Sequence, residues 1–467
     1  MKRRQMMKLT KRITKLAAAA LCAVLFTGTL TSFPAFAVVD NSEVGEELSD
    51  GSFTYELIDG TYTITKCDTT SILTEVPELR NGYAITAIAD NAFQSCTYIE
   101  ELNIPDTITS IGANAFAGCT SLKKVTLPSR ITKLETGAFM GCTRLESVDI
   151  PDKVSTIGNY AFYNCSKLKK VKLPGELSSI GAMAFAQCSS ITDIDSSKCG
   201  AFVFEDGILY NSNMQNIYRA STDLSGEVYI RNEVKYIEPG AFSVCVKMTE
   251  LYLPSSVTDI GESAFSYCTS LKKIDFNSGL TNIAPIAFKY CTALESLDFP
   301  ITLDTIGDGA FLGCSSLNKA VIPEGVSAIG EGAFLDCPEF KQVNMPKSVS
   351  RISPHAFGYT LDEEGEYVAD KDFKMSVFTG SAGESYAKTN KLDCSYVDKS
   401  LKRYAFLIVA AALLLAAIVL AVVLMAKGRK SPSKSAKKAE QERLEEESYE
   451  KILDDSDETP KNEKNKE

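Results

Sequence analysis

Histidine is nearly absent from this chain of 467 residues, in which His355 is the only one. A Ser/His/Asp triad, an H-E-x-x-H zinc site and a histidine acid–base pair all require imidazole, so none of them can be built away from His355. His355 directly precedes Ala356, at a position whose residue type varies along the chain, and we expect it on the surface. The chain is therefore predicted not to be an enzyme.

Two short motifs are also missing. The 14 cysteines include no C-x-x-C pair and have no companion histidine, which argues against a metal centre, and no cofactor is expected. No L-P-x-T-G motif precedes the apolar run near the C-terminus, so covalent attachment to a cell wall is not supported. Paired carboxylates are plentiful, but no spacing places two of them across a cleft.

The dipeptide Ala-Phe recurs with a fixed spacing of 23 residues. Its phenylalanines are Phe93, Phe116, Phe139, Phe162, Phe185, Phe242, Phe265, Phe288, Phe311, Phe334 and Phe357, with one gap of 57 residues. A fixed period of this size indicates a solenoid in which each repeat is one coil that packs on its neighbours. The sequence thus predicts one α/β-type solenoid, which offers a broad binding face rather than a deep catalytic pocket.

Residues 120–142 illustrate the strand of one coil. Val125-Thr126-Leu127 alternates apolar, polar, apolar, which is the period of a strand, and Pro128 ends it because proline lacks a backbone donor. Neighbouring strands lie about 4.8 Å apart, so about a dozen coils would stack into a rod or shallow arc with a parallel sheet on one face.

The rest of the coil is a turn and a second apolar segment. Many copies carry Ile-Gly in that segment, as at 157–158, and the glycine is predicted to fit a tight turn that strains other residues. Residues 137–142 are predicted to form a short helical turn that places Ala138 and Cys142 on one face.

The pattern L-x-x-L-x-L-P-x-x-[LIV]-x-x-I-G-x-x-A-F-x-x-C, present in strings such as 122–142, 145–165 and 294–314, resembles the BspA-like leucine-rich repeat family of bacterial cell-surface proteins. The resemblance covers roughly residues 53–393. It implies a right-handed leucine-rich repeat stack with a cap at each end, and an extracellular role in recognition or adhesion. It identifies no ligand, because the ligands of this family are diverse.

Both ends of the chain carry membrane-targeting signals. Residues 1–37 read as a signal peptide, with a basic head, an apolar core and an Ala35-Phe36-Ala37 cleavage site. Residues 404–426 are long and apolar enough for a transmembrane helix, and the basic residues concentrate on its C-terminal side. The repeats are therefore predicted to lie outside a cell membrane crossed once, with the tail in the cytoplasm, in a Gram-positive bacterium.

The expected domain boundaries follow from these segments. After the signal peptide (1–37) come an N-terminal cap (38–90), the leucine-rich repeat solenoid (91–360), a C-terminal cap and stalk (361–400), the transmembrane helix (404–426) and a disordered cytoplasmic tail (427–467). The stretch 199–236 departs from the repeat and is predicted to be an irregular inserted coil, with a functional outgrowth as the alternative.

Charge limits the choice of partners. The chain has 49 basic and 60 acidic residues, of which 7 and 0 lie in 1–37 and 11 and 12 in 404–467, so residues 38–403 keep 31 and 48, a net charge of −17. An acidic ectodomain argues against nucleic acid as a partner. The oligomeric state cannot be read from the sequence.

Ten cysteines follow the repeat phenylalanine by three residues. They are Cys96, Cys119, Cys142, Cys165, Cys188, Cys245, Cys268, Cys291, Cys314 and Cys337. Because cysteine packs as a small apolar residue, we expect a structural ladder of buried thiols. Disulfides between neighbouring coils are the alternative, since adjacent Cα atoms would lie close enough and secretion favours oxidation.

The outward positions of the strands form a polar face, for which two interpretations remain: a solvated sheet face, or a recognition surface for an extracellular protein or glycan. Lys170, Lys172 and Tyr252 flank the insertion and are the candidate ligand-binding residues, because tyrosine and cations are favoured at binding hot spots. The predicted function is recognition or adhesion by a membrane-anchored surface protein. The alternative is a non-catalytic envelope spacer, or a sensor receptor that signals through the tail.

Overall fold

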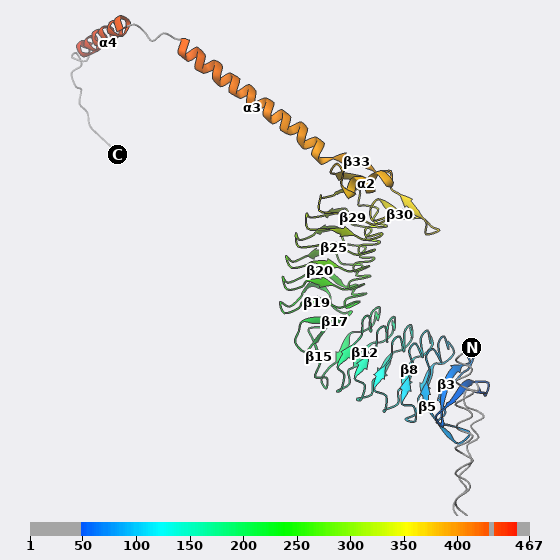
Figure 1. The fold of residues 1–467 in the computed structure, drawn as a ribbon. Helices are drawn as coiled ribbons and strands as arrows, with labels where there is room; N and C mark the ends of the chain where they lie inside the picture. The colour runs from blue at the N-terminus through cyan, green and yellow to red at the C-terminus, as the bar shows by residue number, and fades with distance from the viewer. Residues whose placement is uncertain (1–47, 429–433, 455–467) are drawn as a thin grey trace, which may run out of the picture.

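The computed structural model describes residues 48–428 and 434–454, so the predicted signal peptide lies outside the described residues. Figure 1 shows a solenoid of stacked coils that bends once, followed by a long helix. The stack begins with a cap whose strands are β1 (Leu48–Ser49), β2 (Phe53–Ile58), β3 (Thr61–Cys67), β4 (Leu79–Arg80) and β5 (Tyr83–Ile88).

One side of the solenoid is a row of parallel strands, here called the long-strand face. In the N-terminal arm these strands are β6 (Glu101–Asn103), β8 (Lys124–Thr126), β10 (Ser147–Asp149), β12 (Lys170–Lys172) and β14 (Asp193–Asp195). In the C-terminal arm they are β18 (Gly226–Tyr229), β20 (Met248–Tyr252), β22 (Lys273–Asp275), β24 (Ser296–Asp298), β26 (Lys319–Val321) and β28 (Gln342–Asn344). Val148 pairs with Val125 and Val171, one repeat away on each side, which confirms the solenoid of 23-residue coils.

A second side carries the Ile-Gly segments as two-residue strands, here called the Ile-Gly face. They are β7 (Ser110–Ile111), β9 (Lys133–Leu134), β11 (Thr156–Ile157), β13 (Ser179–Ile180), β19 (Tyr236–Ile237), β21 (Asp259–Ile260), β23 (Asn282–Ile283), β25 (Thr305–Ile306), β27 (Ala328–Ile329) and β29 (Arg351–Ile352). Gly158 has no left-handed backbone, but a Cβ there would lie 2.7 Å from the Glu135 carbonyl carbon. The glycine is thus needed for close approach to the preceding coil, and not for the strained turn that the sequence predicted.

The third side holds the Ala-Phe turns, where the helical turn predicted for 137–142 does not form. Gly137 and Gly141 are left-handed, with φ of 65° and 73°. Successive N–H groups alternate between a hydrogen bond within the turn and a hydrogen bond to the next coil. Met140 donates to the Gly137 carbonyl of its own turn, whereas Phe139 donates to the Ala161 carbonyl of the next coil. Backbone bonds between coils therefore replace the helical bonds, and Ala138 and Cys142 remain buried.

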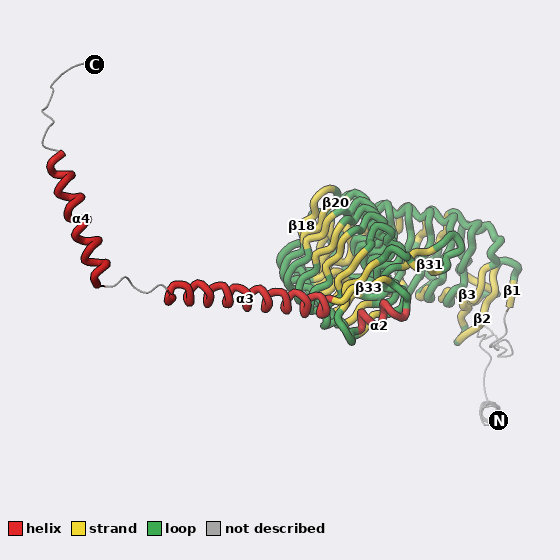
Figure 2. The backbone as a smooth tube through the Cα atoms, turned by 90° about the horizontal axis from the view of Figure 1, so that it is seen from above, coloured by secondary structure: helices red, strands yellow, loops and turns green. Residues whose placement is uncertain are grey.

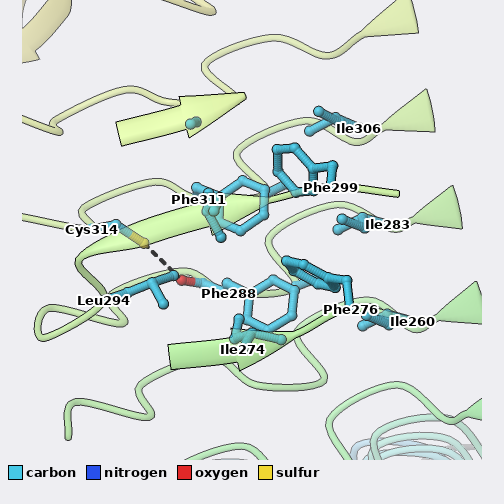
Figure 3. Close-up of a cluster of buried hydrophobic side chains, with 14 of the residues drawn as sticks. Ile260, Ile274, Phe276, Ile283, Phe288, Leu294, Phe299, Ile306, Phe311 and Cys314 are labelled. Carbon is cyan, nitrogen blue, oxygen red and sulfur yellow. Dashed lines mark hydrogen bonds between the residues drawn. The ribbon is translucent and has the colours of Figure 1, made fainter. Parts of the chain in front are cut away.

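The interior is a column of phenylalanines from the Ala-Phe turns. Phe265, Phe288 and Phe311 are fully buried and stack in parallel, with ring centroids 5.1 and 5.2 Å apart. Phe276 and the isoleucines of the Ile-Gly face close the column from the opposite side (Figure 3). A coil of this length cannot bury these rings by itself, so stacking supplies the core.

Residues 199–236 interrupt the solenoid and bend it. Their strands β15 (Phe202–Glu205), β16 (Ile208–Asn211) and β17 (Asn216–Ala220) form an antiparallel sheet whose last strand pairs with β19. The long-strand face breaks here, because its first sheet ends at β14 and the next begins at β18. The buried side chains divide into two clusters at the same place, one ending at Leu209 and one beginning at Ile208. The expected rod or shallow arc is therefore corrected to two arms with a bend between them (Figure 1).

The C-terminal end adds further coils to the solenoid. A hairpin of β30 (Tyr359–Leu361) and β31 (Tyr367–Ala369) precedes β32 (Lys374–Val377), α2 (Ala382–Thr389) and β33 (Asp393–Tyr396). Strands β32 and β33 extend the long-strand face beyond β28. Helix α3 (Val397–Gly428) begins directly after β33 and leaves the solenoid beside α2 (Figure 2).

Helix α3 contains Leu407–Met425, the single stretch within the described residues that is long and apolar enough to cross a membrane. Helix α4 (Lys434–Asp454) then occupies part of the segment for which the sequence predicted disorder. Its composition explains the difference, because it is rich in the helix formers Lys and Glu and has i,i+4 ion pairs such as Lys438–Glu442, 3.8 Å apart.

Candidate functional site

The long-strand face presents two exposed side chains from most of its strands. In β8, β10, β12 and β14 the middle residue is buried and its two neighbours are exposed, as the alternation in the sequence predicted. Within each sheet of this face, neighbouring strands are held in register by backbone hydrogen bonds, so their exposed side chains form two parallel rows. The face is therefore a fixed polar surface, and the insertion divides it.

On the N-terminal side of the break, the two candidate lysines lie beside carboxylates. Lys170 and Lys172 are exposed on β12, in register with Asp193 and Asp195 of β14. The Lys170 ammonium lies 3.7 Å from the Asp193 carboxylate. Hydrogen bonds from Ser197, with a smaller contribution from the Lys172 charge, lower the pKa of Asp195. Both lysines are thus partly neutralised by their neighbours.

On the C-terminal side of the break, the third candidate stacks on a tyrosine that the sequence prediction missed. The rings of Tyr229 and Tyr252 are parallel, with centroids 4.4 Å apart. Each phenol donates to the glutamate two residues before it: Tyr229 to Glu227 at 2.6 Å and Tyr252 to Glu250 at 2.7 Å. These carboxylates raise the pKa of Tyr229 to about 12 and also raise that of Tyr252.

The three predicted residues therefore belong to two different sheets. Lys170 and Lys172 lie on β12 and Tyr252 on β20, with β14, the insertion and β18 between them in the chain. The residue that joins Tyr252 is Tyr229, and a sequence signal for it existed. Glu227-Val228-Tyr229 repeats the Glu-x-Tyr pattern of Glu250-Leu251-Tyr252, but it lies inside the irregular stretch, where the spacing of 23 residues cannot locate it.

A buried arginine on the side of the Ala-Phe turns joins the two arms. Arg219 is fully buried on β17, in a coil that lacks the Ala-Phe turn. Its guanidinium donates to the Cys188 carbonyl of the N-terminal arm at 2.9 Å and to the Ser243 carbonyl of the C-terminal arm at 3.0 Å. The side chain of Ser243 also accepts a hydrogen bond from the Gln187 N–H, at 2.8 Å. Arg219 thus fills the space of the missing turn and ties the arms together.

The cysteine ladder lies in the core on the side of the Ala-Phe turns, and all ten of its members are buried. The Cys314 thiol donates to the Phe288 carbonyl at 3.3 Å (Figure 3), and Cys142 makes the same bond to Phe116 at 3.2 Å. Burial raises the pKa of Cys188 to about 11 and that of Cys245 to about 12, although the nearby charge of Arg219 opposes both shifts. The thiols serve as buried donors to the backbone of the preceding coil.

His355 is half-buried, and its predicted surface position is corrected. Its ring lies parallel to that of Tyr367, with centroids 3.7 Å apart, and edge-on to Tyr359 at 4.9 Å. The hairpin of β30 and β31, which the sequence did not predict, supplies both tyrosines. Within the described residues no group of three His, Cys, Asp or Glu side chains is arranged to hold a metal ion.

The repeats match a known family. The model for the BspA type leucine rich repeat region matches residues 86–216 and 235–362 in six copies, which together span more than half of the chain. The chain belongs to this family. Membership indicates a binding or recognition role, and proteins of this kind are typically not enzymes. No curated protein matches the chain in sequence.

Solved structures include similar solenoids. A leucine rich cell surface protein from Faecalibacterium prausnitzii A2-165 is 28% identical, with a TM-score of 0.49 and coverage of 67% of this chain and 96% of that one. The pneumococcal vaccine antigen PcpA is 16% identical, with a TM-score of 0.51 and coverage of 76% and 99%. At that identity, the likeness to PcpA shows the fold alone.

Proposed function

We propose that this family member is a membrane-anchored surface protein that recognises an extracellular partner, in adhesion, through the long-strand face on both sides of the break. The observation that supports this most is the aromatic stack of the exposed Tyr229 on the half-buried Tyr252, which lies where the face is interrupted. Tyr229 is 64% exposed, although burying a tyrosine ring is favourable. Exposed tyrosines on a rigid surface are typical of binding hot spots.

The anchoring part of the proposal rests on helix α3. Leu407–Met425 has the length and composition of a membrane span, and six basic residues lie between 427 and 438 on its C-terminal side. By the positive-inside rule this places the tail in the cytoplasm and the repeats outside. Protease added to intact cells should remove an epitope in the repeats and leave an epitope in the tail. The opposite result would reverse the orientation.

Recognition is tested with the full-length chain in lipid nanodiscs, against an array of extracellular matrix proteins and glycans. The test variant replaces Lys170, Lys172 and Tyr252 with alanine. The matched control replaces Lys133, Lys235 and Tyr236, exposed residues on or beside the Ile-Gly face, and changes the charge by the same amount.

We expect saturable binding that the test variant loses and the control keeps. Equal loss in both variants would contradict the assignment to the long-strand face. If no member of the array binds, the recognition proposal fails and the spacer or sensor alternative takes its place. Deleting residues 431–467 should then abolish the cellular phenotype of a sensor, whereas an adhesin binds without them.

A further inference from the structure

The chain already binds an ammonium group on one of its own tyrosines. The Lys273 ammonium lies 5.2 Å from the ring centroid of Tyr252 and 3.7 Å from the Glu250 carboxylate, which also accepts the hydrogen bond from Tyr252. An aromatic face attracts a cation electrostatically, and an adjacent carboxylate adds an ion pair. Tyr252 and Glu250 thus form a working cation site that the next coil fills.

The same pair occurs one coil earlier, without an internal cation. Glu227 is in register with Glu250 and Tyr229 with Tyr252, so the two Glu-Tyr pairs have the same arrangement on neighbouring strands. One face of the Tyr229 ring is covered by Tyr252. The other face points along the solenoid toward the break, where β18 is the edge of its sheet and pairs with no further strand among the described residues.

Basic side chains near the break are already paired with carboxylates, so none of them occupies the open face of Tyr229. Arg231, two residues after Tyr229, is engaged with Glu205 at 3.1 Å and Asp206 at 2.8 Å. Lys170 on the other side of the break is paired with Asp193. Within the part of the chain that the structure describes, no lysine or arginine lies over the Tyr229 ring, whereas Tyr252 has Lys273. The net charge of −17 over residues 38–403 also attracts cationic partners.

We propose that the open face of Tyr229, together with Glu227, binds an ammonium or guanidinium group from a lysine- or arginine-rich segment of an extracellular protein. The inference rests on the proposed recognition function and names its ligand class. The incoming cation takes the position on Tyr229 that Lys273 takes on Tyr252, but on the opposite side of the stack. A sugar ring could also stack on a tyrosine, but the internal ammonium and the acidic surface favour a cation.

The test measures the affinity of an oligolysine peptide for the full-length protein in nanodiscs of zwitterionic lipid, which avoids binding of the peptide to anionic lipid. Tyr229→Leu removes the ring, and Tyr98→Leu is the matched control because Tyr98 is 58% exposed in the N-terminal arm. Both variants keep the protein charge, so non-specific attraction of the peptide is the same. Tyr229→Phe keeps the aromatic face and removes only the hydroxyl.

We expect Tyr229→Leu to weaken oligolysine binding about three- to fivefold, which corresponds to a cation–aromatic contact at an exposed site, and Tyr98→Leu to leave it unchanged. Tyr229→Phe should bind within about twofold of the parent, and Glu227→Gln should bind more weakly and with a smaller dependence on salt. Equal affinities for Tyr229→Leu and Tyr98→Leu would overturn the proposal.

The array and the oligolysine titration together distinguish a wrong ligand class from a wrong recognition function. If a glycan from the array binds and is lost in Tyr229→Leu, while oligolysine affinity is unchanged, the recognition surface stands and the ligand class is wrong. If no array member binds, the recognition function fails. If Tyr229→Leu still weakens oligolysine binding in that case, the cation site on Tyr229 is supported without the recognition function.

Discussion

Phe288→Ala tests whether burial of the phenylalanine column stabilises the solenoid. Phe288 is fully buried and contacts three other rings: Phe265 at 5.1 Å, Phe311 at 5.2 Å and Phe276 at 6.0 Å between centroids. Truncating a buried phenylalanine to alanine costs about 3 to 5 kcal/mol, because the ring leaves a cavity that its neighbours cannot fill. Three ring contacts place Phe288 in the upper part of that range.

The assay is urea unfolding of the full-length protein in detergent, followed by hydrogen exchange on peptides from each arm. With an m-value of about 2 to 3 kcal/mol per M, a loss of about 4 kcal/mol lowers the midpoint of the C-terminal arm by about 1.5 M. The N-terminal arm should shift much less, because its buried cluster ends at Leu209 and coils contact only their neighbours.

Ile301→Ala is the matched control in the same arm, because Ile301 is 65% exposed and should cost less than about 0.5 kcal/mol. The backbone carbonyl of residue 288 is kept in the variant, so the hydrogen bond from Cys314 survives and the measured loss reports the ring. A midpoint for Phe288→Ala equal to that of Ile301→Ala would refute the column as the core.

Four further predictions concern the joint between the arms, the thiols (two predictions) and the end of the solenoid. Arg219→Met should lower the free energy of unfolding in urea by about 2 to 5 kcal/mol, because the Cys188, Gly240 and Ser243 carbonyls lose their buried donor. An unchanged free energy of unfolding would mean that Arg219 does not stabilise the contact between the two arms. A thiol reagent should find almost none of the ten ladder thiols in native protein and most of them in urea, and a count near zero in urea would instead indicate disulfides. Because burial raises the pKa of Cys188 and Cys245, these thiols ionise at lower pH in the unfolded chain than in the folded one, so stability should fall as pH rises from about 8.5 toward 12; a flat melting temperature up to pH 10 would contradict this. The Lys388 side chain, the Gly380 N–H and the Tyr396 hydroxyl lower the pKa of Glu384 to about 2, so the contribution of Glu384 to stability is complete above about pH 4.3 and is lost as pH falls toward 2. The hydrogen-exchange protection factors of residues 380–396, taken relative to the intrinsic exchange rate at each pH, should fall over that range in the parent and not in Glu384→Gln.

The regular part of the fold could be predicted because each coil repeats the same local rules. The Ala-Phe spacing, the alternation in segments such as 125–127 and the proline after the strand each predict a feature that the structure contains. The prediction of a helical turn at 137–142 was wrong because every second N–H group there bonds to the next coil, and such bonds leave no signature within a single repeat. The Ile-Gly glycine was placed correctly but for the wrong physical reason.

The candidate site could be predicted only in part. Tyr252 lies on a regular strand and could be found by spacing, whereas Tyr229 lies in the irregular stretch. Their stacking depends on the pairing of β18 with β20. The spacing of 23 residues does not predict this pairing, because β18 lies within the irregular stretch 199–236. The bend and the role of Arg219 depend on contacts between segments 21 to 31 residues apart that share no repeated pattern.

The most direct test of the recognition surface is the hydrogen-exchange footprint of a partner bound to the full-length protein in nanodiscs, using the protein or glycan that binds most tightly in the array. The account predicts that protection falls on the long-strand face beside the break, in peptides that contain Lys170–Lys172, Gly226–Tyr229 and Met248–Tyr252. Protection confined to the Ile-Gly face, or to the hairpin of β30 and β31, would contradict it.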